Sequence, residues 1–418
     1  MLPKDIRIEV ADIVYWWIGE GFVSETNGRT TFETGKEYVL ELCNRCLLIG
    51  EHDMFERNIV FVKIHDLVRD MAIKIAREVN FTSLDEREMP ELSAESRRLR
   101  IFDNGAIENV ESTRADNSKI ESKLRTLWGL DIEKEVFLNK NLELRKLKRL
   151  RLLIAWFRSK NQEQIIMKDW LYRITSLLSL VYLGLHDCIV EQLPDSIGNL
   201  RNLQFLTLSN FENLKMLPST MTKLDKLIVF RIFECASLTC MPEEIGRLSK
   251  LERLERLPYT NSSQKIASRI ELKHLLRVEI SFFPYYGSEG DAFVSKLNHL
   301  LSPLQCLQEL RLACYPGQST PVWLNPTSLP HLKFLCIDFG RRLRYMSPEF
   351  WEGNWKIEGL CMMELFELEE ESIMFLRAMP SLRMVRVFDC PRLKSFPLDV
   401  TQDDAIWRKE DDDTPGKH

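Results

Sequence analysis

Three stretches within residues 1–80 carry apolar side chains at every third or fourth position. This spacing places one apolar stripe along each of three predicted helices, the first of which Gly21 can end in the left-handed conformation. Between the second and third stretches, a polar loop separates two short apolar runs at 47–49 and 59–62, which is typical of a hairpin. The order helix, helix, hairpin, helix predicts a winged-helix-like unit. The stripes comprise Val10, Ile13, Val14, Trp17 and Ile18; Val39, Leu42, Cys43 and Cys46; and Val68, Met71, Ala72, Ile75 and Ala76.

A different period begins at residue 124, where the motif L-x-x-L-x-L, with aliphatic substitutes, starts to return along the chain. Its starts lie 23 to 25 residues apart, with two longer intervals of 32 and 33 residues. Leucine-rich repeats have a period of about 20 to 29 residues, and neighbouring repeats share one core because a single repeat cannot bury its leucines. We therefore predict an α/β fold in which a leucine-rich-repeat solenoid, or horseshoe, follows the winged-helix-like unit. The motif starts are Leu124, Leu147, Leu180, Leu203, Leu227, Leu251, Leu275, Leu307, Leu332, Ile357 and Leu382.

Two further signals recur with the same period. Cys188, Cys235 and Cys390 each stand three residues after the last aliphatic position of the motif, where a small side chain turns into the core. Packing is therefore the preferred role of these cysteines over redox or metal chemistry. The segments LPDSIGNL (193–200), LPSTMTKL (217–224) and MPEEIGRL (241–248) are predicted to cover the convex side of the array.

Composition limits the compartment and partners of the chain. The net charge is −5, and residues 1–80 hold ten Lys and Arg against fourteen Asp and Glu, so no basic field favours nucleic acid. No run reaches the ~18 apolar residues of a membrane span, and charges near Met1 stand where a signal peptide needs its apolar core. Ten cysteines in 418 residues are too few for a secreted disulfide scaffold. We expect a cytoplasmic protein with reduced thiols, no membrane span and no nucleic-acid partner.

The sequence lacks the familiar motifs of catalysis and cofactor binding. In ETGKE, Gly35 and Lys36 are followed by Glu37, where a phosphate-binding loop needs Ser or Thr. There is no G-x-S-x-G, H-E-x-x-H or dinucleotide fingerprint. Cys43 and Cys46 form a CNRC without the second pair of ligands that zinc requires, and we place both on the apolar face of a helix. We predict no enzymatic activity, no metal and no cofactor in this chain.

A polar pair, His65 and Asp66, interrupts the apolar pattern where the predicted strand ends and the third helix begins. Asp66 is a candidate N-cap, and its carboxylate favourably meets the positive end of the helix dipole. A structural role explains the pair without a ligand, because tight nucleotide binding needs several backbone donors and a cation.

Two segments resemble a known family. LPKDIRIEVADIVYWWIGEGFV (2–23) is similar to the F-P-E-D-x-x-I and L-x-x-x-W-I-A-E-G-F segments of plant nucleotide-binding leucine-rich-repeat immune receptors of the coiled-coil class. VKIHDLVRDMA (62–72) resembles their V-K-M-H-D-L-x-R-D-x-A segment, with Ile64 in place of Met. ESRRLRIF (95–102) resembles the first strand of their repeat array, and the three Leu-Pro segments resemble their L-P-x-x-I-G-x-L pattern.

This resemblance implies a domain order and a nucleotide role. The domains would be a winged-helix-like remnant of the nucleotide-binding module at 1–80, a linker at 81–94, a solenoid with a capping strand near Leu99 and Ile101 at 95–400, and a charged, disordered tail at 401–418. In the family, His65 and Asp66 would sense nucleotide, with the His approaching the β-phosphate of ADP. ADP or ATP is expected only if an upstream nucleotide-binding domain is present. The chain then reads as N-terminally truncated, and whether Met1 is the native start is left open.

The implied function is that of an intracellular innate immune receptor whose repeats recognise a pathogen effector or a guarded host protein and lead to a defence response. In a longer receptor, its own N-terminal domains would be a further partner. The alternative is a truncated, non-signalling adaptor or decoy that only binds protein through its repeats. Aromatic and arginine side chains most often anchor interfaces, and those predicted on the concave face are Tyr182, His186, Phe205, Phe233, Arg253, Arg256, Arg277, Arg311, Phe334, Arg383, Arg386 and Phe388.

Overall fold

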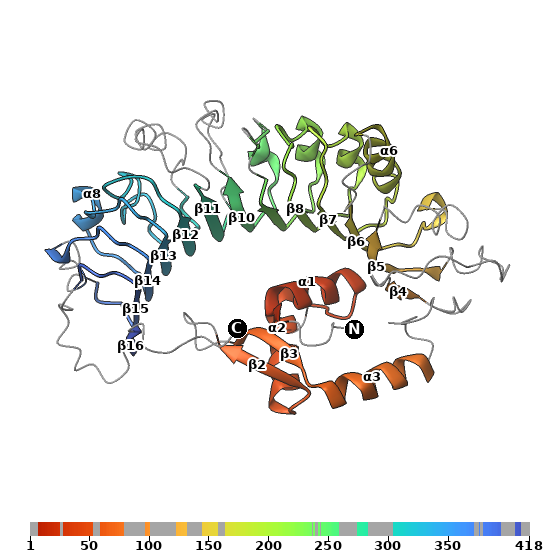
Figure 1. The fold of residues 1–418 in the computed structure, drawn as a ribbon, viewed down its shortest axis with the longest axis horizontal. Coiled ribbons are helices and arrows are strands. Elements are labelled where there is room, and N and C mark those ends of the chain that lie inside the picture. The colour runs from red at the N-terminus through yellow and green to blue at the C-terminus, as the bar shows by residue number, and fades with distance from the viewer. Residues whose placement is uncertain are drawn as a thin grey trace. The chain divides into compact units, whose positions relative to one another are not determined.

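The chain divides into two compact units, and Figure 1 labels their helices and strands. The first comprises Met1–Val190 and Pro194–Asn210, and the second comprises Glu191–Leu193 and Phe211–His418. Each unit is described by itself below. The structure, a computed structural model, describes residues 7–25, 28–52, 59–78, 97–100, 123–131, 144–157, 164–235, 237–238, 241–242, 244–258, 274–282, 304–371, 376, 379–393 and 406–410.

The N-terminal part of the first unit has the predicted order of elements. Helices α1 (Val10–Glu20) and α2 (Thr31–Asn44) precede the antiparallel hairpin of β2 (Leu48–His52) and β3 (Ile59–Ile64), and helix α3 (Asp66–Glu78) follows. A short strand β1 (Ile8–Glu9), which the sequence did not predict, pairs antiparallel with β3 and completes a sheet in the order β1-β3-β2. The winged-helix-like prediction is confirmed.

Local sequence signals explain where α1 and α2 begin and end. Gly21 ends α1 with φ of 84°, a left-handed conformation that glycine adopts without a steric penalty. Thr30 and Glu33 form a reciprocal capping box at the start of α2. Gly35 allows the two helices to touch, because a Cβ atom there would lie 2.5 Å from Cγ1 of Val14. The glycine of the ETGKE segment therefore serves packing.

Two sequence predictions for this domain are wrong in detail. Cys46 lies beyond the end of α2, exposed and with φ of 57°, and so it does not share the apolar helix face with Cys43. On α3, Met71 and Ile75 of the predicted stripe are 64% and 53% exposed, and Leu67 is 71% exposed beside them, whereas Ala76 is buried. The spacing of these three residues places an apolar strip on the outer side of α3.

The rest of the first unit is the beginning of the repeat array. Its parallel strands are β4 (Arg98–Arg100), β5 (Thr126–Asp131), β6 (Leu152–Trp156), β7 (Tyr182–His186) and β8 (Phe205–Ser209). The returning segments include η2 (Leu144–Lys146), α6 (Gln164–Ile174) and η3 (Asp195–Asn199). β4 contains Leu99 of the predicted capping strand, while Ile101 and the predicted linker at 81–94 lie outside the described residues.

The second unit continues with the same parallel pattern. Its strands are β9 (Val229–Phe233), β10 (Arg253–Pro258), β11 (Arg277–Ser281), β12 (Glu309–Ala313), β13 (Phe334–Asp338), β14 (Gly359–Met363), β15 (Met384–Phe388) and β16 (Ile406–Glu410). The returning segments include η4 (Ser219–Lys223), η5 (Ile245–Arg247) and α8 (Pro348–Trp351). β16 pairs in register with β15, so the prediction of a disordered tail from residue 401 is wrong for 406–410.

Alternation along each strand produces the core, as predicted. Leu183 and Leu185 of β7 are fully buried, and so are Leu206 and Leu208 of β8. The cysteines predicted to pack, Cys188, Cys235 and Cys390, are buried free thiols, and burial raises the pKa of Cys188 to about 12. The turn after each strand repeats as well, since a residue with positive φ follows β7, β8, β9, β12, β13, β14 and β15.

The predicted register of one repeat needs correction. The motif start at Leu147 would have placed the strand core at Leu150 and Leu152. Instead, β6 pairs Leu153 with Leu183 and Ala155 with Leu185, so this motif starts at Leu150. Leu147 and Leu150 are both fully buried. Because Leu147, Leu150 and Leu152 also have the spacing L-x-x-L-x-L, the pattern alone could not distinguish a motif that starts at Leu147 from one that starts at Leu150.

Candidate protein-binding surface

In each repeat strand, the residues that alternate with the buried leucines form the opposite face of the sheet, which we call the concave face. The structure places ten of the twelve predicted residues in strands at these alternate positions. They are Tyr182, His186, Phe205, Phe233, Arg253, Arg277, Arg311, Phe334, Arg386 and Phe388. Their placement follows from the period of two, but their surroundings differ greatly between the two units.

Two predicted residues are wrongly placed or undescribed. Arg383 directly precedes β15 and lies two and four residues before the core residues Val385 and Val387. By strand alternation it belongs to their side and not to the concave face, although it is exposed. Arg256 lies in β10 within a bulge, because the register between β10 and β11 shifts between Leu254 and Leu257. The side chain of Arg256 lies outside the described part of the chain.

In the first unit, helix α1 covers the aromatic part of the concave face (Figure 1). Tyr15 stacks on Phe205 with ring centroids 4.8 Å apart, and Trp16 packs edge-on against Trp128 at 4.3 Å. As a result, Tyr182 and Phe205 are only 4% and 2% exposed. The prediction that these two side chains offer a free surface is therefore wrong, because the N-terminal domain already occupies it.

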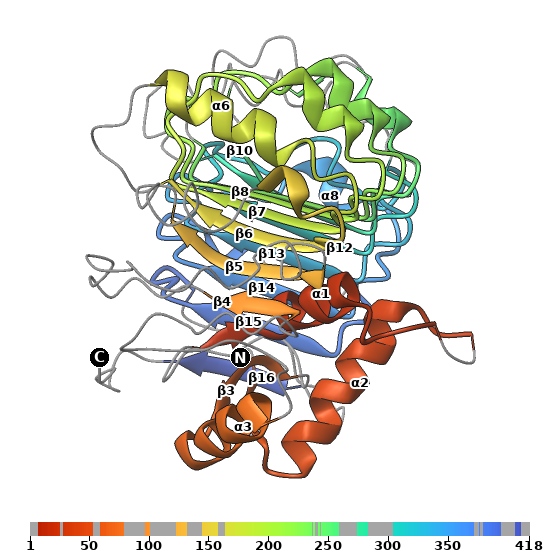
Figure 2. The same cartoon turned by 90° about the vertical axis from the view of Figure 1, so that its right-hand side faces the viewer.

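Close backbone approach completes this contact. A Cβ atom on Gly19 would lie 3.3 Å from Cβ of Tyr182 and 3.7 Å from a methyl group of Leu152. The guanidinium of Arg151, just before β6, donates a hydrogen bond from Nε to the Gly19 carbonyl oxygen at 2.8 Å. This bond satisfies one of the carbonyl groups that the end of α1 leaves without an intrahelical partner. Figure 2 shows α1 against the first strands from a second direction.

A buried ion pair lies at the end of α1. Arg98 of β4 donates from Nε and Nη2 to Oε2 of Glu20, at 3.1 and 2.8 Å. Burial raises the pKa of Glu20, and the positive charge of Arg98 offsets part of that rise. The other carboxyl oxygen, Oε1, is buried without a hydrogen-bond partner among the described residues. Arg98 is therefore the ion-pair partner of Glu20, in surroundings that disfavour the charge of the carboxylate, and Arg125 and Arg151 add positive charge nearby.

The sequence contained a signal for this contact that the single-stripe interpretation missed. Residues 14–18 read VYWWI, and Val10, Ile13 and Gly19 are apolar as well. The last two turns of α1 before Glu20 therefore carry no charged side chain on any side. A helix that is apolar all round is normally buried on all sides. One face of α1 packs on α2, and the other on the repeats. Trp128 and Leu152 of the repeats were likewise absent from the predicted surface.

The C-terminal ends of β6 and β7 carry a further aromatic pair. Trp156 stacks on His186 with ring centroids 4.9 Å apart and an interplanar angle of 16°. The two residues are register partners in the parallel ladder, and both side chains are half-buried. The predicted residue His186 thus lies on the concave face as part of a stacked pair.

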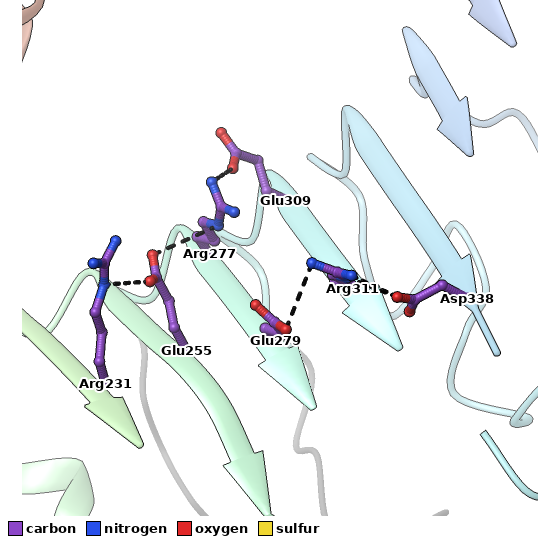
Figure 3. A network of polar contacts seen from close by, with 7 residues as sticks. All are labelled: Arg231, Glu255, Arg277, Glu279, Glu309, Arg311 and Asp338. Atoms are coloured by element: carbon purple, nitrogen blue, oxygen red, sulfur yellow. Dashed lines mark hydrogen bonds and ion pairs between the residues drawn. The ribbon is translucent and has the colours of Figure 1, made fainter. Parts of the chain in front are cut away.

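In the second unit, charged side chains replace the aromatic row (Figure 3). Arg231 of β9 pairs through Nε with Glu255 of β10 at 2.5 Å, and both side chains are more than nine-tenths buried. Arg277 of β11 lies 3.7 Å from Glu255 and 3.1 Å from Glu309 of β12. Burial alone would raise the pKa of Glu255, but the arginines around it outweigh burial and lower that pKa. Arg231, Glu255 and Glu309 were not among the residues predicted for this face.

A second group of charges follows on the next strands. Arg311 of β12 donates to Oδ2 of Asp338 in β13, from Nη2 at 2.5 Å and from Nε at 3.2 Å, and its Nη1 lies 3.7 Å from Glu279. Burial would lower the pKa of Arg311, but the hydrogen bond and charge of Asp338 raise it overall. The Asp338 carboxylate is fully buried beneath this guanidinium. Arg277 and Arg311 therefore have structural partners, while each keeps about a third of its side chain exposed, 37% and 35%.

The remaining concave aromatics are half-buried. Phe334 of β13 lies over Gly359 of β14, where a Cβ atom would come within 2.7 Å of its ring. Phe233 and Phe388, at the ends of β9 and β15, have intermediate exposure, and so does Arg386 in β15. These positions lie on the predicted face.

The structure assigns His65 and Asp66 different parts in starting α3 from those predicted. The N–H of Leu67 donates to Nδ1 of His65 at 3.3 Å, and the N–H of Arg69 donates to the His65 carbonyl oxygen at 2.9 Å. His65 is therefore the N-cap, and Asp66 is the first residue of the helix. Both side chains are exposed. The Asp66 carboxylate still lies in the first turn, where it meets the positive end of the helix dipole.

The described residues form neither a membrane-spanning helix nor a metal-binding cluster. None of the helices there is both long and apolar enough to cross a membrane. The same part of the chain holds no group of three or more His, Cys, Asp or Glu side chains arranged for a metal ion.

Comparison with sequence families gives two matches along the chain. The family described as "Disease resistance protein Winged helix domain" matches residues 1–72, which span α1 to the start of α3. The family described as "Leucine-rich repeat region" matches residues 167–404, which is more than half of the chain. The two matches agree with the two kinds of structure described above.

Individual proteins match across nearly the whole chain. "Disease resistance RPP13-like protein 4" of Arabidopsis thaliana is 34% identical over 98% of this chain and 50% of its own length. "Putative disease resistance protein At1g59780" of the same plant is 29% identical over 94% of this chain and 46% of its own length. The chain thus spans about half the length of the curated relatives it matches. Among solved structures, the leucine-rich repeat domain of the type III effector XopL aligns at 19% identity with a TM-score of 0.33, covering 56% of this chain and 69% of that one.

Proposed function

Because the chain belongs to the plant disease resistance proteins that join a winged-helix domain to leucine-rich repeats, we propose that it is a cytoplasmic, non-catalytic immune receptor that recognises a pathogen effector or a guarded host protein. Binding to the concave face of the repeats leads to the defence response. The relatives' names support a role in disease resistance. The partner and the signalling step are part of the proposal.

The observation that carries this proposal is the row of arginines in the second unit. Arg277 and Arg311 are fixed in place by carboxylates from neighbouring strands, and each still exposes about a third of its side chain. A guanidinium whose rotamer is already fixed loses little entropy when it binds a partner. Arginine is also among the residue types that most often dominate the energy of an interface. A protein partner with carboxylates or aromatic side chains would suit this row.

The contact between α1 and the first repeats supports a signalling role. It buries Tyr15 and Glu20 of the N-terminal domain against Phe205 and Arg98 of the array. A partner that disturbs the first strands would therefore change how the N-terminal domain is held. In this proposal, the contact restrains the receptor until a partner binds.

Nucleotide sensing through His65 and Asp66 is a further part of the proposal. Nδ1 of His65 is engaged in the α3 cap, so Nε2 is the atom available to a phosphate. ADP or ATP would be held only together with an upstream nucleotide-binding domain, because one imidazole cannot replace a set of backbone donors and a cation. The variant His65→Asn separates the two roles, since Asn retains an N-cap acceptor and lacks the imidazole.

The proposal is tested by expressing the full chain in leaf cells together with pathogen effectors, one at a time. An effector that binds the purified chain should trigger cell death, and Arg253→Ala combined with Arg277→Ala should reduce both binding and death. Arg247→Ala is the matched control, because Arg247 lies in η5 and forms an exposed ion pair with Glu244. If Arg247→Ala reduced binding and cell death as much as the double variant, at equal protein levels, recognition through the concave face would be contradicted.

The adaptor or decoy alternative gives a different result in the same experiment. A decoy should bind the effector through the same arginines and cause no cell death. It should also remain silent in His65→Asn and Asp66→Val, which would activate a restrained receptor. Cell death with either variant would exclude the decoy.

A further inference from the structure

Two cysteines occupy the centre of the concave face in the second unit. Cys336 of β13 and Cys361 of β14 are register partners in the parallel ladder, and both alternate with buried aliphatic residues. Their side chains therefore stand side by side on one face of the sheet. Neighbouring strands lie about 4.8 Å apart, within the Cα separation of roughly 4.4 to 6.8 Å that a disulfide spans.

The two thiols also affect each other. Burial raises the pKa of Cys361, and a hydrogen bond with the Cys336 thiol raises it further. Both cysteines are free thiols. Cys361 is 2% exposed, whereas Cys336 has intermediate exposure. A reagent from solvent would therefore meet Cys336 first.

Guanidinium groups flank the pair along the ladder. Arg311 is the register partner of Cys336, and Arg386 is the register partner of Cys361. The negative charge of Asp338 adds to the rise in the pKa of Cys361, and the positive charge of Arg386 opposes it.

The other described cysteines differ from this pair. Cys188, Cys235 and Cys390 are buried in the turns that follow the strands, and Cys235 and Cys390 donate their thiol hydrogens to backbone carbonyl oxygens. Cys46 and Cys306 are exposed in turns, and Cys43 and Cys314 have intermediate exposure. Cys336 and Cys361 are therefore distinguished as two thiols that stand side by side on neighbouring strands.

From this geometry we propose that Cys336 and Cys361 are a modification site at which a hydroperoxide forms a reversible disulfide across β13 and β14. The sequence analysis assigned these two residues no role, and the proposal does not depend on which protein the repeats bind.

The chemistry takes place in two steps. The Cys336 thiolate attacks the outer oxygen of the hydroperoxide, the O–O bond breaks, and Cys336 becomes a sulfenic acid while water or an alcohol leaves. The Cys361 sulfur then attacks the Cys336 sulfur, the S–O bond breaks, and the released hydroxide takes the Cys361 proton to form water. The peroxide is reduced by two electrons, and the two thiols together are oxidised by two. Because the two residues are register partners on neighbouring strands, the second step is intramolecular, which offsets the low acidity of Cys361.

The test is peptide mapping of the full chain after treatment with hydrogen peroxide, under non-reducing conditions. We expect a peptide pair joined through Cys336 and Cys361, at least about tenfold more abundant than any other cysteine pairing, and lost on treatment with dithiothreitol. Cys336→Ser should abolish the cross-link and leave Cys361 reduced. Cys306→Ser, which removes an exposed thiol of the same unit, should leave the cross-link unchanged.

Phenylarsine oxide supplies a second measurement, because one arsenic atom bridges two adjacent thiols. The native chain should gain one bridge that involves Cys336 and Cys361, and Cys336→Ser should lose it. The proposal is overturned if Cys336 is oxidised to a sulfinic acid while Cys361 stays a thiol, or if the cross-links show no preference for this pair. These two outcomes are measured on the native chain, so they do not depend on whether Cys336→Ser folds.

Discussion

Glu20 at the end of α1 and Arg98 in β4 form a buried ion pair that joins the winged-helix domain to the first strand of the repeats, 78 residues further along the chain. Only 6% of the Glu20 side chain and 14% of the Arg98 side chain are exposed. In such surroundings the loss of one partner leaves the other charge buried without compensation. A single substitution at Glu20 or Arg98 should therefore weaken the contact between the winged-helix domain and β4.

The first prediction concerns this pair. Arg98→Met should lower the free energy of unfolding of the first unit by about 3 to 5 kcal/mol, because Glu20 remains buried without its partner. Adding Glu20→Leu should recover most of the loss. Chemical denaturation followed by tryptophan fluorescence measures both, since Trp16 and Trp128 lie in the same contact.

A surface pair provides the control. Lys215 and Glu191 lie 3.1 Å apart with more than half of each side chain exposed, so Lys215→Met should cost under about 1 kcal/mol. If Arg98→Met and Lys215→Met shift the midpoint of chemical denaturation equally, the contact between α1 and β4 is not formed in solution.

The second prediction concerns pH. The pKa of Glu20 is raised by burial, so the folded chain binds this proton more readily than the unfolded chain. Stability contributed by Glu20 is therefore fully present below its ordinary pKa near 4.5 and is lost as pH rises through the raised value. Between about pH 7 and pH 4.5, acidification should increase the Tm of the native chain relative to that of Glu20→Gln. A difference in Tm that stays constant over this range would contradict the burial of the carboxyl group.

The pattern of leucines was sufficient to predict the array and the face of most concave residues. Tyr182 and Phe205 were placed on the correct face because a strand has a period of two. Their burial could not be predicted that way, because the residues that cover them belong to α1, far away in the sequence. The apolar character of α1 on all sides was the available signal.

Other details escaped prediction for local reasons. The bulge in β10 moves Arg256 out of simple alternation, and Arg383 precedes its strand by one residue. The pairing of Arg231 with Glu255, and of Arg311 with Asp338, depends on register between repeats more than 20 residues apart. A single sequence indicates charges at these positions but not which of them meet.

The third prediction follows from the charged row. Arg231→Ala should cost about 3 to 5 kcal/mol, because Glu255 is buried and Arg231 is its closest positive partner. Arg247→Ala, at an arginine whose side chain is 66% exposed, should cost under about 1 kcal/mol. Urea denaturation of the two variants measures the difference. Similar midpoints would mean that the Arg231 and Glu255 side chains are hydrated rather than paired.

The fourth prediction separates the core from the concave face within a single strand. Leu206 and Thr207 are neighbours in β8, but Leu206 points into the core with no exposed surface and Thr207 points to the opposite face. Leu206→Ala should lower the free energy of unfolding by about 2 to 5 kcal/mol, because it leaves a cavity between two repeats. Thr207→Ala removes only a methyl and a hydroxyl group, and should cost under about 1 kcal/mol. Midpoints of denaturation for the two purified variants test the assignment, since equal shifts would require the two side chains to exchange faces.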